Sequence, residues 1–199
     1  MSTPHLEPEW VRARLAGHQP AAIDGEVAPR RAAVSIILRP AYAADAVSLL
    51  FIHRSVHSED PWSGHMAFPG GRIEESDPSP LHAARRETLE EVGIDLQGAG
   101  ELVGQLDDQR ASARGRVLPL AISPFVFLLD GPVEARCSDE VAEVLWVPVP
   151  MLLDPAHAST VPYTLEGQRF ELPCIKVFDR TIWGLTYQML MGLFRVLEW

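Results

Sequence analysis

One stretch of the chain, residues 70–94, carries its own helix boundaries and constrains the fold more than any other. Ser79 can accept a hydrogen bond from the first turn of a helix, and Pro80 suits that turn because its missing N–H is not needed there. Gly93 stands where a glycine commonly ends a helix. Four residues between these ends recur at helical spacing and form an apolar stripe: Leu81, Ala84, Thr88 and Val92. The sequence therefore predicts a helix over residues 79–92 that packs one face against a core.

Three carboxylates of this predicted helix share one face. Glu87, Glu90 and Glu91 lie at positions i, i+3 and i+4. Like charges at these spacings destabilise a helix by a few tenths of a kcal/mol per pair. A hard divalent cation would offset the repulsion, because carboxylate oxygens are the ligands that Mg²⁺ and Mn²⁺ prefer. The triplet by itself also fits an ordinary solvated helix face, since Glu-rich helices are common.

The residues before the helix favour the metal interpretation. Phe68 and Pro69 are followed by Gly70 and Gly71, where a strand gives way to a loop. A backbone without side chains can approach a ligand or a metal closely. We therefore expect a cup in which a glycine carbonyl and the three carboxylates hold a hard cation.

This stretch resembles the Nudix box. The usual box is a glycine, five residues, a glutamate, seven residues and then Arg-Glu-U-x-Glu-Glu-x-Gly-U, where U is bulky and apolar. Gly71 matches the first glycine, and residues 86–94 match the second half. The sequence departs from the pattern twice: Asp77 replaces the isolated glutamate, and eight residues rather than seven separate it from Arg86. We expect the extra residue in the turn at 78–80, before the helix, where it leaves the carboxylate triplet undisturbed.

The resemblance implies a fold, a cofactor and a chemistry. The fold is an α/β (α+β) domain, a Nudix-type α/β/α sandwich around a mixed β-sheet, and the cofactor is Mg²⁺ or Mn²⁺. The implied metal ligands are Glu87, Glu90, Glu91 and the carbonyl of Gly71. Arg86 would orient the glutamates by ion pairing. The implied reaction is attack of water on a diphosphate, with a glutamate of the box or of a later loop as the general base.

Residues 54–71 resemble a second signature, that of Nudix enzymes that hydrolyse coenzyme A. Arg54-Ser55 and the run at 67–71 fit that signature, and residues 182–186 resemble another segment of the same subfamily. Glu59 and Asp60 stand where a basic residue is typical, although a basic residue would suit the 3′-phosphate of coenzyme A. Two substrate classes remain open: coenzyme A or an acyl derivative, and another nucleoside diphosphate derivative such as a nucleotide sugar or a dinucleotide.

Five residues outside the box are candidates for the site. Arg54 is either a phosphate clamp or a surface arginine at a strand end, and Ser55 accompanies it in the substrate-binding signature. Trp62 either stacks on a base or pantetheine or packs its own loop. His65 is either a structural or a catalytic histidine. Glu140 is a metal ligand, a general base or a solvated loop residue.

The remaining pattern predicts layered α+β or α/β architecture. We expect strands over residues 32–38, 47–54, 101–106, 116–129, 141–148 and near 170–178, helices over 5–16 and 181–197, and loops over 55–65 and 149–169. Residues 1–30 are expected to form an N-terminal helix and connector, and residues 31–199 a single domain. The apolar C-terminal helix is expected to be buried or to contact a second subunit, which would make a homodimer.

Charge and cysteine content narrow the partners and the compartment. The chain has 17 Lys plus Arg against 27 Asp plus Glu, a formal net charge of −10, which argues against nucleic acids and anionic membranes as extended partners. Two cysteines make no disulfide framework, and this favours a cytoplasmic protein. A phosphorylated small molecule remains compatible with the charge if metal ions stand between it and the carboxylates. The rival interpretation, a non-catalytic nucleotide-sensing module, would be expected to lose carboxylates that this chain retains.

Overall fold

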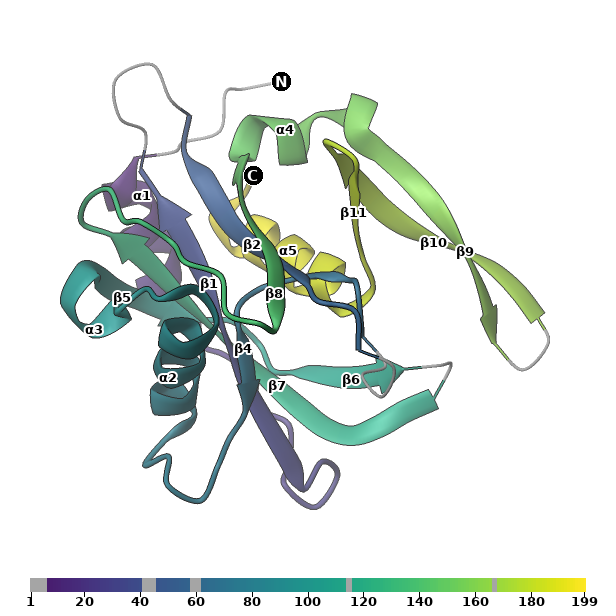
Figure 1. Ribbon diagram of the computed structural model, residues 1–199, viewed down its shortest axis with the longest axis horizontal. Coiled ribbons are helices and arrows are strands. Elements are labelled where there is room, and N and C mark those ends of the chain that lie inside the picture. Colours follow the sequence, from purple (N-terminus) through teal and green to yellow (C-terminus); the bar gives the residue numbers. More distant parts are fainter. Residues whose placement is uncertain (1–6, 41–45, 58–61, 114–115, 166–167) are drawn as a thin grey trace.

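A mixed β-sheet forms the centre of the protein (Figure 1). The computed structural model describes residues 7–40, 46–57, 62–113, 116–165 and 168–199. Within these ranges the sheet has the strand order β3-β2-β1-β7-β5, with β4 and β8 paired to β1 and β2 and with β6 paired to β7. Its strands are β1 (Arg30–Arg39), β2 (Ser48–Arg54), β3 (Met66–Ala67), β4 (Gly70–Arg72), β5 (Gly100–Gln105), β6 (Gln109–Ala113), β7 (Arg116–Leu129) and β8 (Val141–Pro148). The parallel pair β1–β7 lies at the middle, and the other pairings of this sheet are antiparallel.

Helices cover both faces of this sheet. Side chains alternate along a strand, so Ala33 and Ile37 of β1 point to one face, while Ile36 and Leu38 point to the other. Helices α2 (Pro80–Val92) and α3 (Leu96–Ala99) pack on the first face. Helices α1 (Pro8–Ala16) and α5 (Gly184–Leu197) pack on the second. The predicted α/β/α sandwich around a mixed sheet is therefore confirmed.

The prediction of a loop over residues 149–169 is wrong. The structure places helix α4 (Val149–Leu153), a 3₁₀ turn (Pro155–His157) and strand β9 (Ala158–Leu165) there. Prolines suggested a loop, yet each lies where its missing N–H is tolerated. Pro150 and Pro155 occupy first turns, and Pro162 belongs to β9, which is an edge strand.

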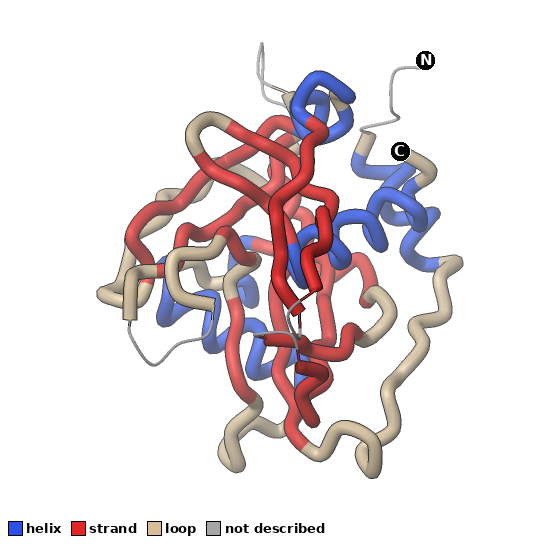
Figure 2. The backbone as a smooth tube through the Cα atoms, turned by 90° about the vertical axis from the view of Figure 1, so that its right-hand side faces the viewer, coloured by secondary structure: helices blue, strands red, loops and turns tan. Residues whose placement is uncertain are grey.

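Strand β9 opens a second, three-stranded sheet. It pairs with β10 (Gln168–Val177), and β10 pairs with β11 (Arg180–Trp183), both in antiparallel fashion. Viewed from the side, this sheet stands in front of the larger one (Figure 2). The predicted strand near 170–178 is thus confirmed as β10.

The C-terminal helix begins three residues later than expected. Residues 180–183 form β11, and Gly184, with a φ of 61°, turns the chain into α5. Leu190 and Leu193 are buried within the same chain, which is the first of the two expected roles for this helix. None of the helices in the described ranges is long and apolar enough to cross a membrane.

The N-terminal helix is attached to the C-terminal one. The Trp10 indole Nε1 donates to the carbonyl of Leu197 over 3.1 Å, and Val11 and Leu15 are buried in the same core as α5. The helix begins at Pro8 in the structure; of the predicted range 5–16, residues 5 and 6 lie outside the described residues.

Replacing Leu190 by Ala should destabilise the fold. Its side chain is fully buried between α5 and the sheet, so the substitution leaves a cavity and should lower the free energy of unfolding by about 3 kcal/mol. Leu89→Ala is the matched control, because Leu89 is also helical but 51% exposed, and its effect should stay within about 0.5 kcal/mol. Urea denaturation measures both, and equal effects would contradict the burial of α5.

Candidate active site

The helix that carries the carboxylates has the boundaries that the sequence predicts. The Ser79 hydroxyl accepts a hydrogen bond from the backbone N–H of His82 (3.2 Å), and Pro80 lies in the first turn. At the other end Gly93 has a φ of 69° and donates its N–H to the carbonyl of Leu89 over 3.0 Å. Helix α2 runs unbroken between these ends, so the longer box spacing leaves Glu87, Glu90 and Glu91 on one helix.

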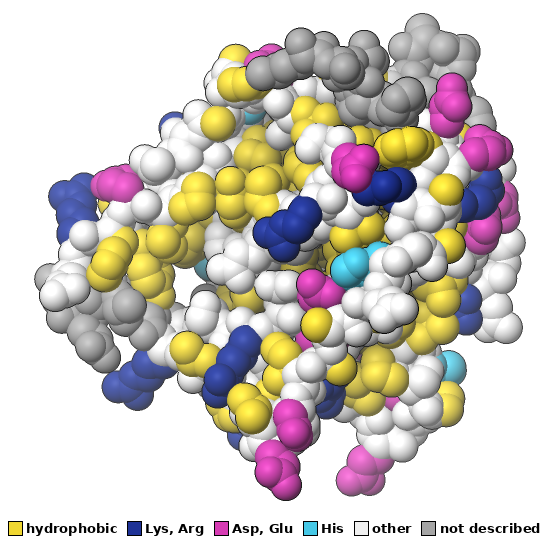
Figure 3. Space-filling view, turned by 180° about the vertical axis from the view of Figure 1, so that it is seen from behind, with side chains coloured by type: hydrophobic (Ala, Val, Ile, Leu, Met, Phe, Trp, Pro, Cys, Tyr) yellow, Lys and Arg dark blue, Asp and Glu magenta, His cyan; other side chains and the backbone are white. Residues whose placement is uncertain are grey.

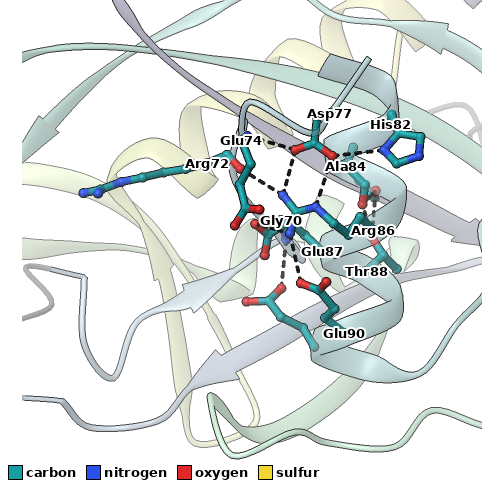
Figure 4. Close-up of polar contacts among 12 residues, drawn as sticks. Gly70, Arg72, Glu74, Asp77, His82, Ala84, Arg86, Glu87, Thr88 and Glu90 are labelled. Carbon is teal, nitrogen blue, oxygen red and sulfur yellow. Dashed lines mark hydrogen bonds and ion pairs between the residues drawn. The ribbon is translucent and has the colours of Figure 1, made fainter. Parts of the chain in front are cut away.

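The guanidinium of Arg86 connects the residues of the candidate site to one another (Figure 4). Its Nη1 donates to carboxylate oxygens of Glu87 (3.0 Å) and Glu90 (2.9 Å). On its other side it donates to both carboxylate oxygens of Asp77, over 3.1 and 2.9 Å, and to the carbonyl of Arg72 over 3.1 Å. Arg86 therefore orients two of the three glutamates. Its bidentate pair with Asp77 in turn fixes the orientation of the guanidinium.

Asp77, which stands where the box pattern has a glutamate, binds the guanidinium of Arg86. Its side chain is only 1% exposed, and it also accepts hydrogen bonds from the backbone N–H of Glu74 and from the ring of His82. The hydrogen bonds from Arg86 hold the pKa of the Asp77 carboxyl far below its usual range, and the pKa of Arg86 is raised in turn. The loop after β4 brings the short Asp77 side chain within hydrogen-bonding distance of Arg86.

Gly70 and Gly71 let the backbone of β4 pack against its neighbours without side chains. A Cβ atom at Gly71 would lie 2.4 Å from a carboxylate oxygen of Glu87, and one at Gly70 would lie 2.3 Å from the carbonyl oxygen of Ala33. The φ of Gly70, 147°, also favours glycine. The carboxylate of Glu87 thus lies directly over the Gly71 backbone, as the predicted cup requires.

Glu91 is a buried carboxylate that faces the guanidinium of Arg54. Its side chain is 4% exposed, accepts a hydrogen bond from the Gly70 N–H (2.8 Å) and lies 3.6 Å from Nη1 of Arg54. Burial raises the pKa of Glu91 to about 7, and the charges of Glu87 and Glu140 add to the shift. Burial also raises the pKa of Glu87. A buried and a half-buried carboxylate, Glu91 and Glu87, make a donor set that fits a hard divalent cation.

The full ligand set is not assembled in the structure. Among the described residues, no three carboxylate, histidine or cysteine side chains form a group that could hold a metal ion. Glu87 and Glu90 are joined through the guanidinium of Arg86 instead. Glu90 is 57% exposed and has room to change rotamer, so the set of Glu87, Glu90, Glu91 and the Gly71 carbonyl remains a prediction.

Glu140 lies beside the box. Its carbonyl accepts a hydrogen bond from the backbone N–H of Ser55 (2.9 Å), and its charge contributes to the raised pKa values of Glu87 and Glu91. Glu140 is exposed, and it sits one residue before β8. The structure therefore places Glu140 near the carboxylates, with Ser55 bonded to its backbone.

A cleft of about 770 Å³ opens at the glycines of the box. Three of the predicted substrate-binding residues line it, namely Arg54, Trp62 and His65, while Ser55 does not. Glu59 and Asp60, the acidic residues of the expected substrate loop, lie outside the described residues.

The sequence indicated the other wall of the cleft only in part, through Trp183 in the segment 182–186. It comes from the three-stranded sheet, through Tyr163 of β9, Leu172 of β10 and Trp183 of β11. The ring of Trp183 lies 4.9 Å from the ring of His65 and 6.1 Å from that of Tyr163, centroid to centroid. Tyr163 falls within the segment predicted as loop, which is why no pattern indicated it.

Comparison with known proteins agrees with this geometry. The family described as NUDIX domain matches residues 29–166. An uncharacterized protein of Schizosaccharomyces pombe is 38% identical over 144 residues, which cover 64% of this chain but only 44% of that protein. The human mitochondrial coenzyme A diphosphatase NUDT8 is 29% identical over 184 residues, covering 82% of this chain and 74% of its own.

A solved structure shows the same fold. The MutT/nudix family protein from Enterococcus faecalis superposes with a TM-score of 0.57 at 18% identity, covering 96% of this chain and 69% of that one. At this identity the likeness concerns the fold alone.

Asp77→Asn should destabilise the protein by about 2 kcal/mol at neutral pH, because it removes the charge and one acceptor of the bidentate pair with Arg86. Since the pKa of Asp77 is lowered in the folded state, its contribution is complete above about pH 4 and is lost as the pH falls further. The deficit of the variant should therefore shrink in acid.

The measurement is urea denaturation at neutral and acidic pH. Asp139→Asn, at an exposed position, serves as the control and should have little effect. A variant at position 77 as stable as wild type at pH 7 would contradict the anchoring role.

Proposed function

The chain belongs to the Nudix family of hydrolases, and from that premise we propose that it is a metal-dependent diphosphatase acting on a nucleoside diphosphate derivative. The observation that carries the proposal is a pair of carboxylates, the half-buried Glu87 and the buried Glu91, packed against Gly71 and Gly70 beside a large cleft. Removing carboxylates from water costs free energy of folding, and a bound divalent cation would offset that cost.

Glu87, Glu90, Glu91 and the Gly71 carbonyl would hold Mg²⁺ or Mn²⁺. The chemistry that the ion supplies when bound is neutralisation of phosphate oxygens and a lower pKa for water. Arg86 keeps the carboxylates of Glu87 and Glu90 aligned. The long side chain of Arg54, at the end of β2, lines the cleft and would bind a phosphate.

Glu140 would act as the general base. Water attacks one phosphorus, the bridging P–O bond breaks, and the proton of the water passes to a carboxylate. Glu140 fits this role because it is exposed and lies near Glu87 and Glu91 without being fixed by Arg86. The leaving phosphate carries away the bridging oxygen.

Coenzyme A or an acyl-coenzyme A is the substrate we favour. Support comes from the signature at residues 54–71 and from the relative named as a coenzyme A diphosphatase, which aligns with 82% of this chain. A panel of diphosphate compounds, incubated with Mg²⁺ or Mn²⁺ and followed by mass spectrometry, tests this choice. Release of 3′,5′-adenosine diphosphate and a phosphopantetheine part is the expected result, and hydrolysis of nucleotide sugars or dinucleotides instead would contradict it.

Domain organisation, oligomeric state and compartment belong to the same proposal. Residues 31–199 would act as one catalytic unit, to which residues 1–30 add a helix, and a homodimer remains a prediction. The free thiols of Cys137 and Cys174 favour a reducing compartment such as the cytoplasm.

Glu90→Gln and Glu91→Gln should each lower turnover at least about a hundredfold, because each removes a charged metal ligand. Glu75→Gln is the matched control, since Glu75 is an exposed box residue outside the site, and it should keep wild-type turnover. Steady-state rates on coenzyme A with Mg²⁺ measure the effect. Wild-type rates in both site variants would overturn the ligand assignment.

Glu140→Gln should lower kcat by roughly a hundredfold or more while leaving metal affinity unchanged, since a general base takes the proton without holding the ion. Kinetics together with calorimetric titration of Mn²⁺ separate these two effects. Glu134→Gln, at an exposed position nearby, is the control. Loss of Mn²⁺ binding in the Glu140 variant would make Glu140 a ligand rather than a base.

A further inference from the structure

Arg54 belongs both to the cleft and to the carboxylate face of the box. Its side chain lines the cleft, and its Nη1 lies 3.6 Å from Oε1 of Glu91. The side chain of Arg54 is 24% exposed and that of Glu91 is 4% exposed, so this ion pair is largely withdrawn from water. The same guanidinium can therefore interact with a carboxylate of the box or with a ligand in the cleft.

The backbone fixes the position from which this side chain extends. The pairing of β2 with β8 changes register between His53 and Arg54, and such an irregularity re-aims a side chain. The N–H of Arg54 donates to the carbonyl of His65 over 3.0 Å, and the N–H of Ser55 donates to the carbonyl of Glu140 over 2.9 Å. A change of partner by Arg54 therefore requires movement of its long side chain only.

The two carboxylate oxygens of Glu91 have different partners. Oε2 accepts a hydrogen bond from the N–H of Gly70 over 2.8 Å, while Oε1 faces the guanidinium of Arg54. The separation of 3.6 Å lies within the range of an ion pair but is longer than a hydrogen bond. Oε1 thus has the weaker contact, and a cation can bind it without breaking the bond to Gly70.

A divalent cation and the guanidinium of Arg54 would compete for this oxygen. Both are positive, and like charges that are close together in a partly buried site repel one another strongly. A diphosphate in the cleft offers negative oxygens, which a guanidinium binds well. Moving the guanidinium from Glu91 to a phosphate therefore removes the repulsion and leaves Oε1 to the metal ion.

A second arginine of the cleft, Arg72, lacks this contact. It also lines the cleft, but Arg86 binds its backbone carbonyl and not its side chain. Within the described ranges its guanidinium forms no ion pair with Glu87, Glu90 or Glu91, and Figure 4 shows it extending away from the carboxylates. Basic side chains lie beside acidic and hydrophobic ones on the face drawn in Figure 3, so the contact with Glu91, rather than proximity to the cleft, distinguishes Arg54.

We propose that Arg54 exchanges partners, from Glu91 before the metal ion and substrate bind to a phosphate of the substrate in the complex, and that this exchange couples the two binding events. The proposal rests on the metal-dependent diphosphatase function above. It makes Arg54 a positioning residue for Glu91 in addition to a phosphate-binding one. Metal ion and substrate then strengthen each other's binding, and this effect is reciprocal.

Removing the guanidinium should tighten metal binding in the absence of substrate. Arg54→Gln and Arg54→Met should each lower the Kd for Mn²⁺ at least about threefold, measured by electron paramagnetic resonance of the free ion. Arg54→Lys should stay close to wild type, because it keeps a positive charge beside Glu91. Damage to the fold would weaken binding rather than tighten it. Unchanged or weaker binding in either substitution that folds, Gln or Met, would overturn the proposal.

Arg72→Gln is the matched control. It removes the same charge from the lining of the cleft but no contact with Glu91, so the Kd for Mn²⁺ without substrate should stay close to wild type. A gain as large as that of Arg54→Gln would mean that only the total charge of the cleft matters, and it would overturn the exchange.

The same Arg54 variants should be poorer enzymes. For the diphosphate compound that the panel above shows to be hydrolysed fastest, kcat/KM at saturating Mn²⁺ should fall at least about tenfold through a higher KM, because the phosphate loses its guanidinium. Tighter metal binding together with weaker substrate binding is a combination that a purely structural role would not produce. An unchanged KM would contradict the phosphate-bound half of the exchange.

The coupling itself is measured with α,β-methylene ADP, whose P–C–P bridge is not hydrolysed. It should increase the affinity for Mn²⁺ more in wild type than in Arg54→Gln, after subtraction of the ion that the compound binds in a titration without protein. An equal increase in the two proteins would overturn the coupling.

The two proposals fail in different ways. If wild type binds no Mn²⁺ and hydrolyses no diphosphate, the metal-dependent function fails, and the exchange fails with it. If wild type binds Mn²⁺ and hydrolyses a diphosphate while the Arg54 variants bind the ion no more tightly, the diphosphatase function stands and the exchange is rejected.

Discussion

The guanidinium of Arg86 holds together the parts of the site that come from separate elements. It joins the loop after β4, through Asp77 and the carbonyl of Arg72, to the glutamate face of α2. On that face it lies between Glu87 and Glu90, whose like charges would otherwise repel at close range. Without this cation the loop would lose its attachment, and the carboxylates would have no fixed direction.

Close packing of backbone completes the arrangement. Because Gly71 lacks a side chain, Glu87 can rest on β4, and because Gly70 offers its N–H, Glu91 can be buried with a hydrogen bond. Burial raises the pKa of Glu91 to about 7, while the Gly70 N–H and the charge of Arg54 act in the opposite direction. A divalent cation would neutralise these carboxylates, and the lining of the adjoining cleft includes Arg54 and Arg72.

Local signals allowed the central helix and most of the main sheet to be predicted from sequence. Ser79, Pro80 and Gly93 act on their immediate neighbours, so they fix the ends of α2 whatever surrounds it. The strand β7 likewise follows from a continuous apolar run. By contrast, β9 depends on pairing with β10, and its Pro162 is tolerated only because β9 lies at an edge. The aromatic wall could not be predicted, because Tyr163, His65 and Trp183 meet only through the tertiary fold.

We propose that the carboxylate face of α2 and the glycine turn of β4 form a divalent metal site. Titration of the purified protein with Mn²⁺, followed by electron paramagnetic resonance of the free ion, tests this most directly. We predict that wild type removes the free-ion signal at a defined stoichiometry and that Glu91→Gln weakens this binding at least about tenfold. Mn²⁺ binding of equal strength in the two proteins, or none in wild type, would contradict the claim.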